Sequence, residues 1–278
     1  MPSGTGAIKV MNEFPERGFD VGIAEPHAVT MGAAMGKAGL KPVTLIYSSF
    51  SHRTVDQVFH DVLLQEDVPT CRVLTGRGLS LRMVDASWRL YDISVFRGFP
   101  GIIIASPVDL REVALLLRWA VDSGKVVALR YPRGSIPALP EVKKMPPVEE
   151  GKGYMVEQGE DVCIIGYGSM VRNALDAAKK LRADGISAGV ANARFAKPID
   201  RDLVSEASKS KLVVTVEEHT VEGGFGAIVA EELRGRADML KIGVPDRFVE
   251  HGTREQLHKI VGLDPDSIAN SIRKELGK

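Results

Sequence analysis

Glu25 is the residue whose type and position best suit chemistry. It follows an apolar, strand-like run at residues 19–24 and precedes a stretch of small residues that is expected to form a helix. A carboxylate at such a position can accept hydrogen bonds and take part in proton transfer. The plainer interpretation is a helix-start carboxylate that the helix dipole stabilises. These residues alone leave both interpretations open.

Aromatic and cationic side chains gather after the next apolar run. Tyr47, Phe50, His52 and Arg53 share one short segment, and Arg133 follows later in a Tyr-Pro-Arg-Gly turn. A guanidinium fork suits a dianion such as a phosphate group. The competing interpretations are core packing for the aromatic residues, surface ion pairing for the arginines and a solvated loop for the histidine.

The segment around Glu25 closely resembles the one that carries the catalytic glutamate of transketolase-type, thiamine-diphosphate-dependent enzymes. The most similar family is 1-deoxy-D-xylulose-5-phosphate synthase. Several segments match it in the right order and near its spacing, which is stronger support than any single glycine-rich turn. The matching segments are residues 19–30, 47–53, 56–62, 130–134, 195–200, 217–219 and 223–226.

The resemblance implies how the cofactor side of a site would work. In the family, a carboxylate hydrogen-bonded to the aminopyrimidine ring of thiamine diphosphate favours the ring form that removes the proton from the reactive thiazolium carbon. Glu25 matches that carboxylate. Phe50 matches the aromatic residue that stacks on the aminopyrimidine, and Tyr47 matches a neighbouring pocket residue.

The substrate side both matches the family and departs from it. Arg53 and Arg133 match arginines that bind the substrate phosphate, whereas His52 stands where the synthase usually has glutamine and is a candidate donor to substrate. The family's Asp-Gly-Pro-Thr-His motif is replaced, with Met83 at the aspartate position and Ser87 at the histidine position. Because serine does not buffer near neutral pH, proton transfer there would be lost or passed to another group. We therefore expect a substrate other than the synthase's own, such as another sugar phosphate or a 2-oxo acid.

The resemblance also implies a partner. The family's N-terminal domain, which holds Mg²⁺ and the diphosphate, has no counterpart here, so no metal ligands are expected in this chain. We expect a separate diphosphate-binding subunit of the transketolase N-terminal type, in a homodimer or a heterotetramer. The pyrimidine-binding domain also lacks the family's first helix and strand, which would expose a sheet edge.

Two other functions compete with that of a transferase subunit. One is a non-catalytic homologue that acts as a dimerisation or regulatory partner, which the loss of the histidine at Ser87 favours. The other is the β subunit of a 2-oxo-acid dehydrogenase, which has the same domain layout. The arginine matches and the Arg-Tyr-Pro-Arg-Gly run at residues 130–134 argue against the second.

The elements that would position these residues alternate between apolar runs and amphipathic stretches, which is typical of an α/β protein with mainly parallel sheets. The resemblance implies two doubly wound domains, a pyrimidine-binding domain at 1–150 and a transketolase C-terminal domain at 151–278. A linker rich in proline and glycine at residues 131–147 separates them. Strands are expected at 42–47, 71–74, 101–105, 125–130, 162–165, 187–193 and 211–217, and helices at 53–65, 109–121, 173–182 and 227–233.

Composition excludes several other classes. The 36 basic and 36 acidic side chains cancel, so nothing indicates nucleic-acid binding. Cys71 and Cys163 lie in apolar runs without metal-ligand spacing and are expected to be reduced core residues. The sequence shows neither a signal-peptide layout nor an apolar run of membrane-spanning length, so no membrane contact and a cytoplasmic location are expected.

Glu218 and His219 are expected to be structural or interfacial.

Overall fold

A computed structural model of the chain describes residues 5–65, 68–77, 90–132 and 138–278, with the backbone alone for residues 71–77 and 132. Arg133, Met83, Ser87 and the side chain of Cys71 lie outside the described residues.

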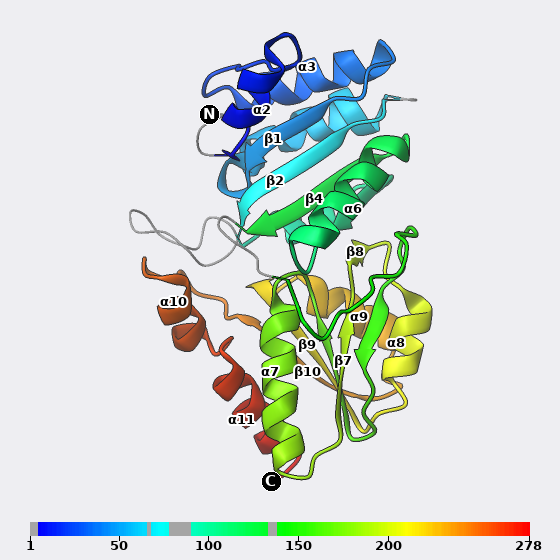
Figure 1. Ribbon diagram of the computed structural model, residues 1–278, viewed down its shortest axis with the longest axis vertical. Coiled ribbons are helices and arrows are strands. Elements are labelled where there is room, and N and C mark those ends of the chain that lie inside the picture. Colours follow the sequence, from blue (N-terminus) through cyan, green and yellow to red (C-terminus); the bar gives the residue numbers. More distant parts are fainter. Residues whose placement is uncertain (1–4, 66–67, 78–89, 133–137) are drawn as a thin grey trace.

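The first half supplies four strands of a five-stranded sheet in the order β1-β2-β4-β3-β8, whose last strand comes from the second half, and the second half forms another sheet in the order β10-β9-β6-β7-β5 (Figure 1). The elements of the first half are α2 (Ile8–Glu13), η1 (Pro15–Arg17), α3 (Glu25–Lys37), β1 (Val43–Tyr47), η2 (Ser48–Thr54), α4 (Val55–Gln57), η3 (Val58–Leu63), β2 (Cys71–Arg77), α5 (Asp92–Phe96), β3 (Ile102–Ala105), α6 (Leu110–Asp122) and β4 (Val126–Pro132).

In the described residues of the second half, six strands and five helices largely alternate along the chain. Its elements are β5 (Tyr154–Glu157), β6 (Val162–Gly166), α7 (Met170–Ala183), β7 (Ala188–Asn192), β8 (Phe195–Lys197), α8 (Arg201–Ala207), β9 (Leu212–Thr220), α9 (Phe225–Leu233), β10 (Asp238–Val244), α10 (Arg254–Val261) and α11 (Pro265–Glu275).

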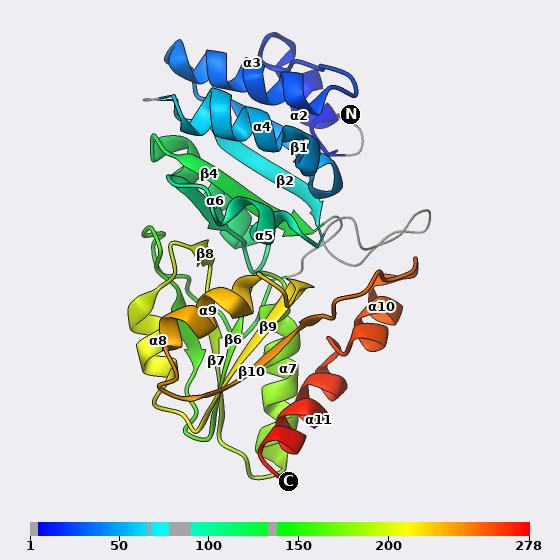
Figure 2. The same ribbon diagram turned by 180° about the vertical axis from the view of Figure 1, so that it is seen from behind.

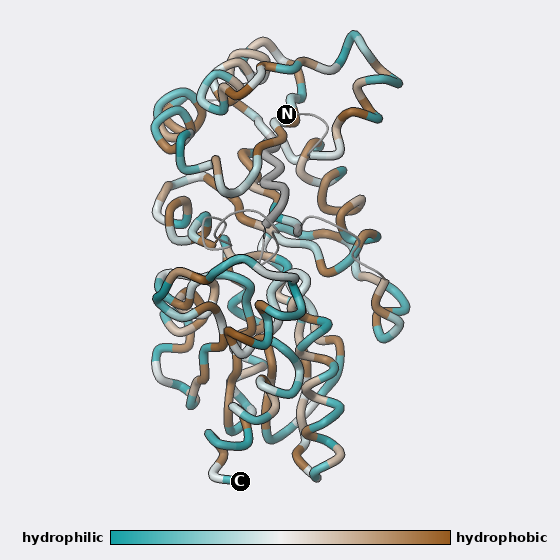
Figure 3. The backbone as a smooth tube through the Cα atoms, turned by 90° about the vertical axis from the view of Figure 1, so that its left-hand side faces the viewer, coloured by the Kyte–Doolittle hydropathy of each residue, from teal (hydrophilic) through white to brown (hydrophobic). Residues whose placement is uncertain are grey.

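The expected fold class, two mainly parallel sheets with helices on both faces, is confirmed. Helix α6 packs on one face of the first sheet, whereas α3, η3 and α5 pack on the other (Figures 1 and 2). In the second sheet, α7 and α11 cover one face and α8 and α9 the other. Hydrophobic stretches, in brown, alternate with hydrophilic ones along the backbone of the half that carries the C-terminus (Figure 3). No helix that the structure describes combines the length and hydrophobicity needed to cross a bilayer.

Strand β8 crosses between the halves. It lies in the second half of the sequence but pairs antiparallel with β3, so that Ile104 faces Lys197 and Ala105 faces Phe195. The amide of Ser106 also donates to the carbonyl of Arg194, at 2.8 Å. The boundary at residues 150 and 151 stays a prediction, and the pairing shows that the first sheet draws on residues beyond it.

Two expected elements differ from the structure. The predicted single helix over 53–65 is instead a 3-10 turn (η2), one α-helical turn (α4) and a π-helix (η3). The hydroxyls of Ser51 and Thr54 donate to the carbonyls of Ser48 and Ser51, each at 2.7 Å, and these local bonds favour the tighter turn over a regular helix. The apolar run at 19–24 forms no strand, and β1 is an edge strand of the first sheet.

Residues 138–147 of the expected linker pack against the rest of the chain and are hydrogen-bonded to it. Leu139 and Val142 are buried, and their carbonyls accept hydrogen bonds from Arg111. Further along, Arg194 donates to the carbonyls of Pro146 and Pro147, at 2.7 and 2.9 Å. Proline lacks an N–H group, so this segment can join no sheet ladder, and arginine side chains satisfy its carbonyls instead.

Arg194 also forms a buried ion pair with Glu112 of α6, with 2.6 Å between Nε and Oε1. The two side chains are 1% and 0% exposed, and Asn192 donates to both carboxylate oxygens. The pair therefore ties the first half to the loop between β7 and β8. Breaking a buried pair leaves an uncompensated charge, which is strongly destabilising.

Replacing Glu112 with glutamine should lower the free energy of unfolding by about 3–5 kcal/mol, because Arg194 would stay buried without its counter-charge. Chemical denaturation of the purified chain measures this. The control is Glu150→Gln in the exposed pair with Lys125, where the loss should stay below about 1 kcal/mol. Equal losses in the two variants would contradict a special role for the buried pair.

Candidate active site

Glu25 is the first residue of α3. Its neighbour Ala24 provides no side-chain cap, and Pro26 occupies a first-turn position, where its missing N–H costs no helical hydrogen bond. The Glu25 side chain is only 12% exposed. Its Oε2 atom is buried and accepts no hydrogen bond from any described residue. A buried carboxylate oxygen with no hydrogen bond can receive a donor from a ligand.

Helix α3 can lie close to the sheet because small residues line its inner face. A Cβ atom on Gly32 would lie 2.8 Å from the Thr44 hydroxyl, and one on Gly36 would lie 2.7 Å from the carbonyl of Pro69. These distances are too short for a side chain, so glycine allows the close approach. The small residues of this predicted helix therefore allow α3 to pack closely against the sheet.

The aromatic residues lie where β1 ends and η2 begins. Tyr47 is the last residue of β1, and its ring contacts that of Phe50 edge to face, with 6.1 Å between centroids. Arg53 lies near the end of η2. Its guanidinium carbon lies 5.5 Å from the centre of the Phe50 ring, and its Nη1 lies 3.5 Å from Oε2 of Glu25. The structure thus brings Glu25, Phe50 and Arg53 into contact, with Tyr47 beside them.

His52 points to a different neighbour. Its Nε2 atom is buried and makes no hydrogen bond to the described residues. Its ring lies 6.5 Å from that of Tyr91, which precedes α5. Partial burial and the charge of Asp246 both raise the pKa of Tyr91. Sequence reasoning missed Tyr91 as a site neighbour, since no motif marks it and it lies 39 residues after His52 in the sequence.

The arrangement suits two kinds of ligand group. A flat ring that carries N–H donors could stack on Phe50 and donate to Glu25. An anion could bind the guanidinium of Arg53, which is 60% exposed. Arg133, the second expected anion ligand, lies outside the described residues. Within the described ranges, no group of three or more His, Cys, Asp or Glu side chains is placed to hold a metal ion.

The Glu-Glu-His run at the end of β9 has partners within the chain. Glu217 accepts hydrogen bonds from the amides of Phe225 and Gly226 and so caps α9. His219 Nε2 accepts from the amide of Ile93, which joins the run to α5. These contacts agree with the structural interpretation of this run.

Glu218 in the same run is fully buried against Arg254 and His258, with shortest contacts of 2.8 and 2.9 Å. Burial alone would raise the pKa of Glu218, but the charges and hydrogen bonds of Arg254 and His258 outweigh it and lower this pKa far below its ordinary value of 4.5.

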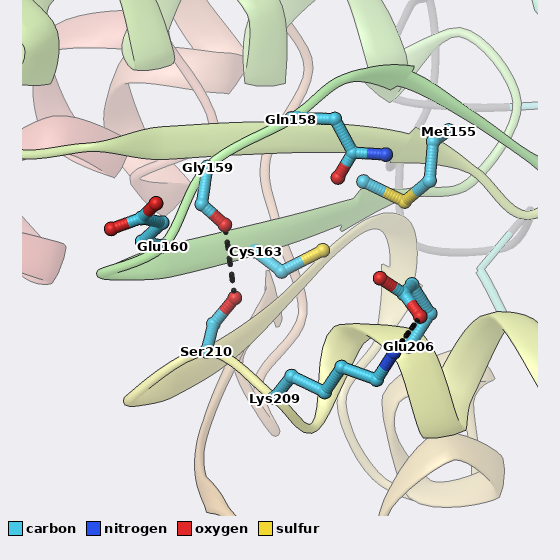
Figure 4. Close-up of a pocket in the computed structure, with 8 residues that line it drawn as sticks. All are labelled: Met155, Gln158, Gly159, Glu160, Cys163, Glu206, Lys209 and Ser210. Carbon is cyan, nitrogen blue, oxygen red and sulfur yellow. Dashed lines mark hydrogen bonds and ion pairs between the residues drawn. The ribbon is translucent and has the colours of Figure 1, made fainter.

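A hollow of about 290 Å³ lies elsewhere, in the second half (Figure 4). Cys163, a buried free cysteine, lines it. Burial, with the charge of Glu206, raises the pKa of this thiol to about 12. A thiol so rarely ionised is a poor nucleophile.

The Glu218 cluster predicts acid sensitivity. Because the pKa of Glu218 is lower in the folded chain than in the unfolded chain, its stabilisation is complete above about pH 4.5 and is lost as the pH falls below that value. The free energy of unfolding should therefore fall less steeply with acid in Glu218→Gln than in the unmodified chain. Urea denaturation over a series of pH values measures the slopes, with exposed Glu149→Gln as the control. Parallel slopes for Glu218→Gln and the unmodified chain would refute the assignment.

Two known protein-family models match this chain, and together they cover the strands of both sheets. Residues 1–138 match the family model described as transketolase, pyrimidine binding domain, and residues 151–268 match transketolase, C-terminal domain.

Curated relatives carry the name 1-deoxy-D-xylulose-5-phosphate synthase. The protein of this name from Magnetococcus marinus is 42% identical over 285 residues, which covers 100% of this chain and 45% of that protein. The synthase 1 from Geobacter sulfurreducens is 41% identical over 274 residues, 97% of this chain and 43% of that protein. The chain therefore spans less than half the length of these relatives.

Solved structures show the same fold. A structure described as a split gene transketolase, an inactive beta4 tetramer, matches with a TM-score of 0.85 and 30% identity over 95% of this chain and 85% of that one. Transketolase from Campylobacter jejuni matches with a TM-score of 0.73 and 17% identity over 94% of this chain and 39% of that one, which shows the fold alone.

Proposed function

Since the chain belongs to the transketolase family, through its pyrimidine-binding and C-terminal domains, we propose that it is one subunit or segment of a thiamine-diphosphate-dependent transferase. The reaction is the transfer of a two-carbon or acyl unit between carbonyl substrates. The observation that carries this proposal is the buried Oε2 of Glu25, which accepts no hydrogen bond from any described residue and lies beside the cation–π contact of Arg53 with Phe50.

The residues present fit the aminopyrimidine end of the cofactor. When bound, thiamine diphosphate supplies a nucleophilic carbon and an electron sink. Glu25 would accept a hydrogen bond from the ring, Phe50 would stack on it and Tyr47 would support Phe50 from the side. His52, with a buried Nε2 that has no hydrogen bond in the described residues, would donate to the substrate.

The diphosphate end needs a second polypeptide or segment. The described residues offer no cluster for Mg²⁺, and the similar solved structure is described as a split gene transketolase. We infer a partner of the transketolase N-terminal type that carries the Mg²⁺ and diphosphate ligands, in a homodimer or heterotetramer in the cytoplasm. The complete site, which holds both ends of the cofactor, then forms where the two surfaces meet, whereas the residues for the ring end lie on this chain.

The substrate is a small phosphorylated sugar or a 2-oxo acid. Arg53 is the exposed guanidinium beside the cofactor residues, and Arg133 is the second candidate phosphate ligand. Ser87 stands where the synthase has histidine. For this reason we do not assign the synthase reaction itself.

Ser87 and Met83 also favour a second candidate, a non-catalytic homologue that serves as a dimerisation or regulatory partner. Such a protein would have no need for a buried carboxylate oxygen open to a ligand. A 2-oxo-acid dehydrogenase β subunit shares the domain layout, but the match of Arg53 and of the Arg-Tyr-Pro-Arg-Gly run at residues 130–134 to the synthase family argues against it.

Calorimetric titration of thiamine diphosphate with Mg²⁺ tests the proposal. The chain should bind the cofactor tightly only together with a diphosphate-binding partner of the transketolase N-terminal type, because each supplies one end of the site. Glu25→Ala should bind it more weakly, since one charge-assisted hydrogen bond worth about 1.5–3 kcal/mol would be lost. Ketol transfer or decarboxylation should disappear in the same variant.

The matched control is Glu13→Ala, an exposed carboxylate at the end of α2, which should bind and react as the unmodified complex does. Unchanged cofactor affinity in Glu25→Ala would rule out the assigned role of this carboxylate. No binding in any combination would leave the non-catalytic homologue.

A further inference from the structure

Arg53 lies where the proposed function places the cofactor ring. Its guanidinium carbon lies over the Phe50 ring, 5.5 Å from the ring centre, and its Nη1 lies 3.5 Å from Oε2 of Glu25. These are the two contacts that the aminopyrimidine would make. One side chain of the chain itself therefore engages both the stacking surface and the acceptor.

Guanidinium and aminopyrimidine share the properties that these contacts need. Each is planar, each presents N–H donors in its plane, and each stacks on an aromatic face. We propose that Arg53 acts as an internal substitute for the cofactor ring: it covers Phe50 and Glu25 in the empty chain and must leave before the ring binds. This inference rests on the proposed function and concerns how access to the site is regulated.

The contact between Arg53 and Glu25 is weak enough for a competing anion to break. At 3.5 Å the Arg53–Glu25 pair is longer than a charge-assisted hydrogen bond, and the Arg53 side chain is 60% exposed. An anion that accepts two parallel hydrogen bonds from the guanidinium would satisfy it better than this single long contact. An anionic group, such as the phosphate of a substrate, would therefore draw Arg53 away from Glu25.

Anion and ring should then bind cooperatively. An anion that removes Arg53 from Phe50 and Glu25 raises the affinity for the ring, and the ring raises the affinity for the anion by the same factor. A phosphate ligand role alone predicts no competition between Arg53 and the ring. The sign of the effect of Arg53 on ring binding therefore distinguishes the two roles.

Thiamine, which carries the ring but no phosphate, is the probe. Ligand-observed NMR titration into the full chain gives its dissociation constant. Arg53→Gln should bind thiamine about tenfold more tightly than the unmodified chain, a factor that corresponds to 1.4 kcal/mol. The matched control is Lys41→Gln, which removes one positive charge from an exposed pair with Asp122 in the same half and should leave the constant unchanged.

A second arm needs no variant. Inorganic phosphate, compared with chloride at equal ionic strength, should tighten thiamine binding to the unmodified chain and have no such effect on Arg53→Gln. Circular dichroism of each variant checks that the fold is retained.

The outcomes separate this inference from the proposed function. Equal or weaker thiamine binding by Arg53→Gln overturns the role of Arg53; if Glu25→Gln abolishes binding in the same series, the proposed cofactor site still stands. Absence of thiamine binding to every chain also overturns the inference. The titration of thiamine diphosphate with the partner then decides separately whether the proposed function falls too.

Discussion

The buried ion pair between Glu112 and Arg194 is the contact on which the arrangement of the two halves depends. Two charges without access to water are stable only when each has its partner and its hydrogen bonds. Here Asn192 and the amide of Val108 complete the carboxylate, and the carbonyls of Pro146 and Pro147 complete the guanidinium. One pair thus fixes α6, the end of the linker and the loop before β8.

A second buried pair works on the side of the candidate site. Arg130 at the end of β4 binds Asp92 at the start of α5, and both side chains are fully buried. The Arg130 guanidinium lies 5.5 Å from the ring centre of Tyr167, which stacks on Phe225 at 4.9 Å. Since Asp92 follows Tyr91, this pair also sets where the neighbour of His52 lies. The second half therefore buttresses the carboxyl edge of the first sheet, the edge where ligands bind in parallel α/β sheets.

Sequence reasoning predicted well what local pattern determines. The apolar runs at β6 and β9 and the helix at α6, with Asp109 as its cap, lie close to their expected bounds. The short strands β5 and β8 were missed, because three or four residues give no readable alternation and their pairing depends on distant partners. Helix α10 was also missed, although Thr253 and Gln256 form a capping box that the sequence spells out.

The candidate site divides in the same way. Family segments marked Glu25, Phe50 and Arg53, and the structure brings these three together. The sequence could not supply geometry: the guanidinium of Arg53, which suits a phosphate, contacts a carboxylate 28 residues earlier in the sequence. The approach of Tyr91 to His52 likewise depends on how strands pair, which no local spacing encodes.

The origin of β8 has a consequence for the order of events on the ribosome. Strand β3 is complete once residue 105 has emerged, but its partner spans Phe195–Lys197. The edge of β3, with its apolar run of Ile102, Ile103 and Ile104, therefore stays open while about ninety further residues are made, for several seconds at ordinary rates of synthesis. Nascent chains of this protein pass through a stage at which an apolar strand edge needs protection, and a chaperone that binds short apolar segments would meet it then.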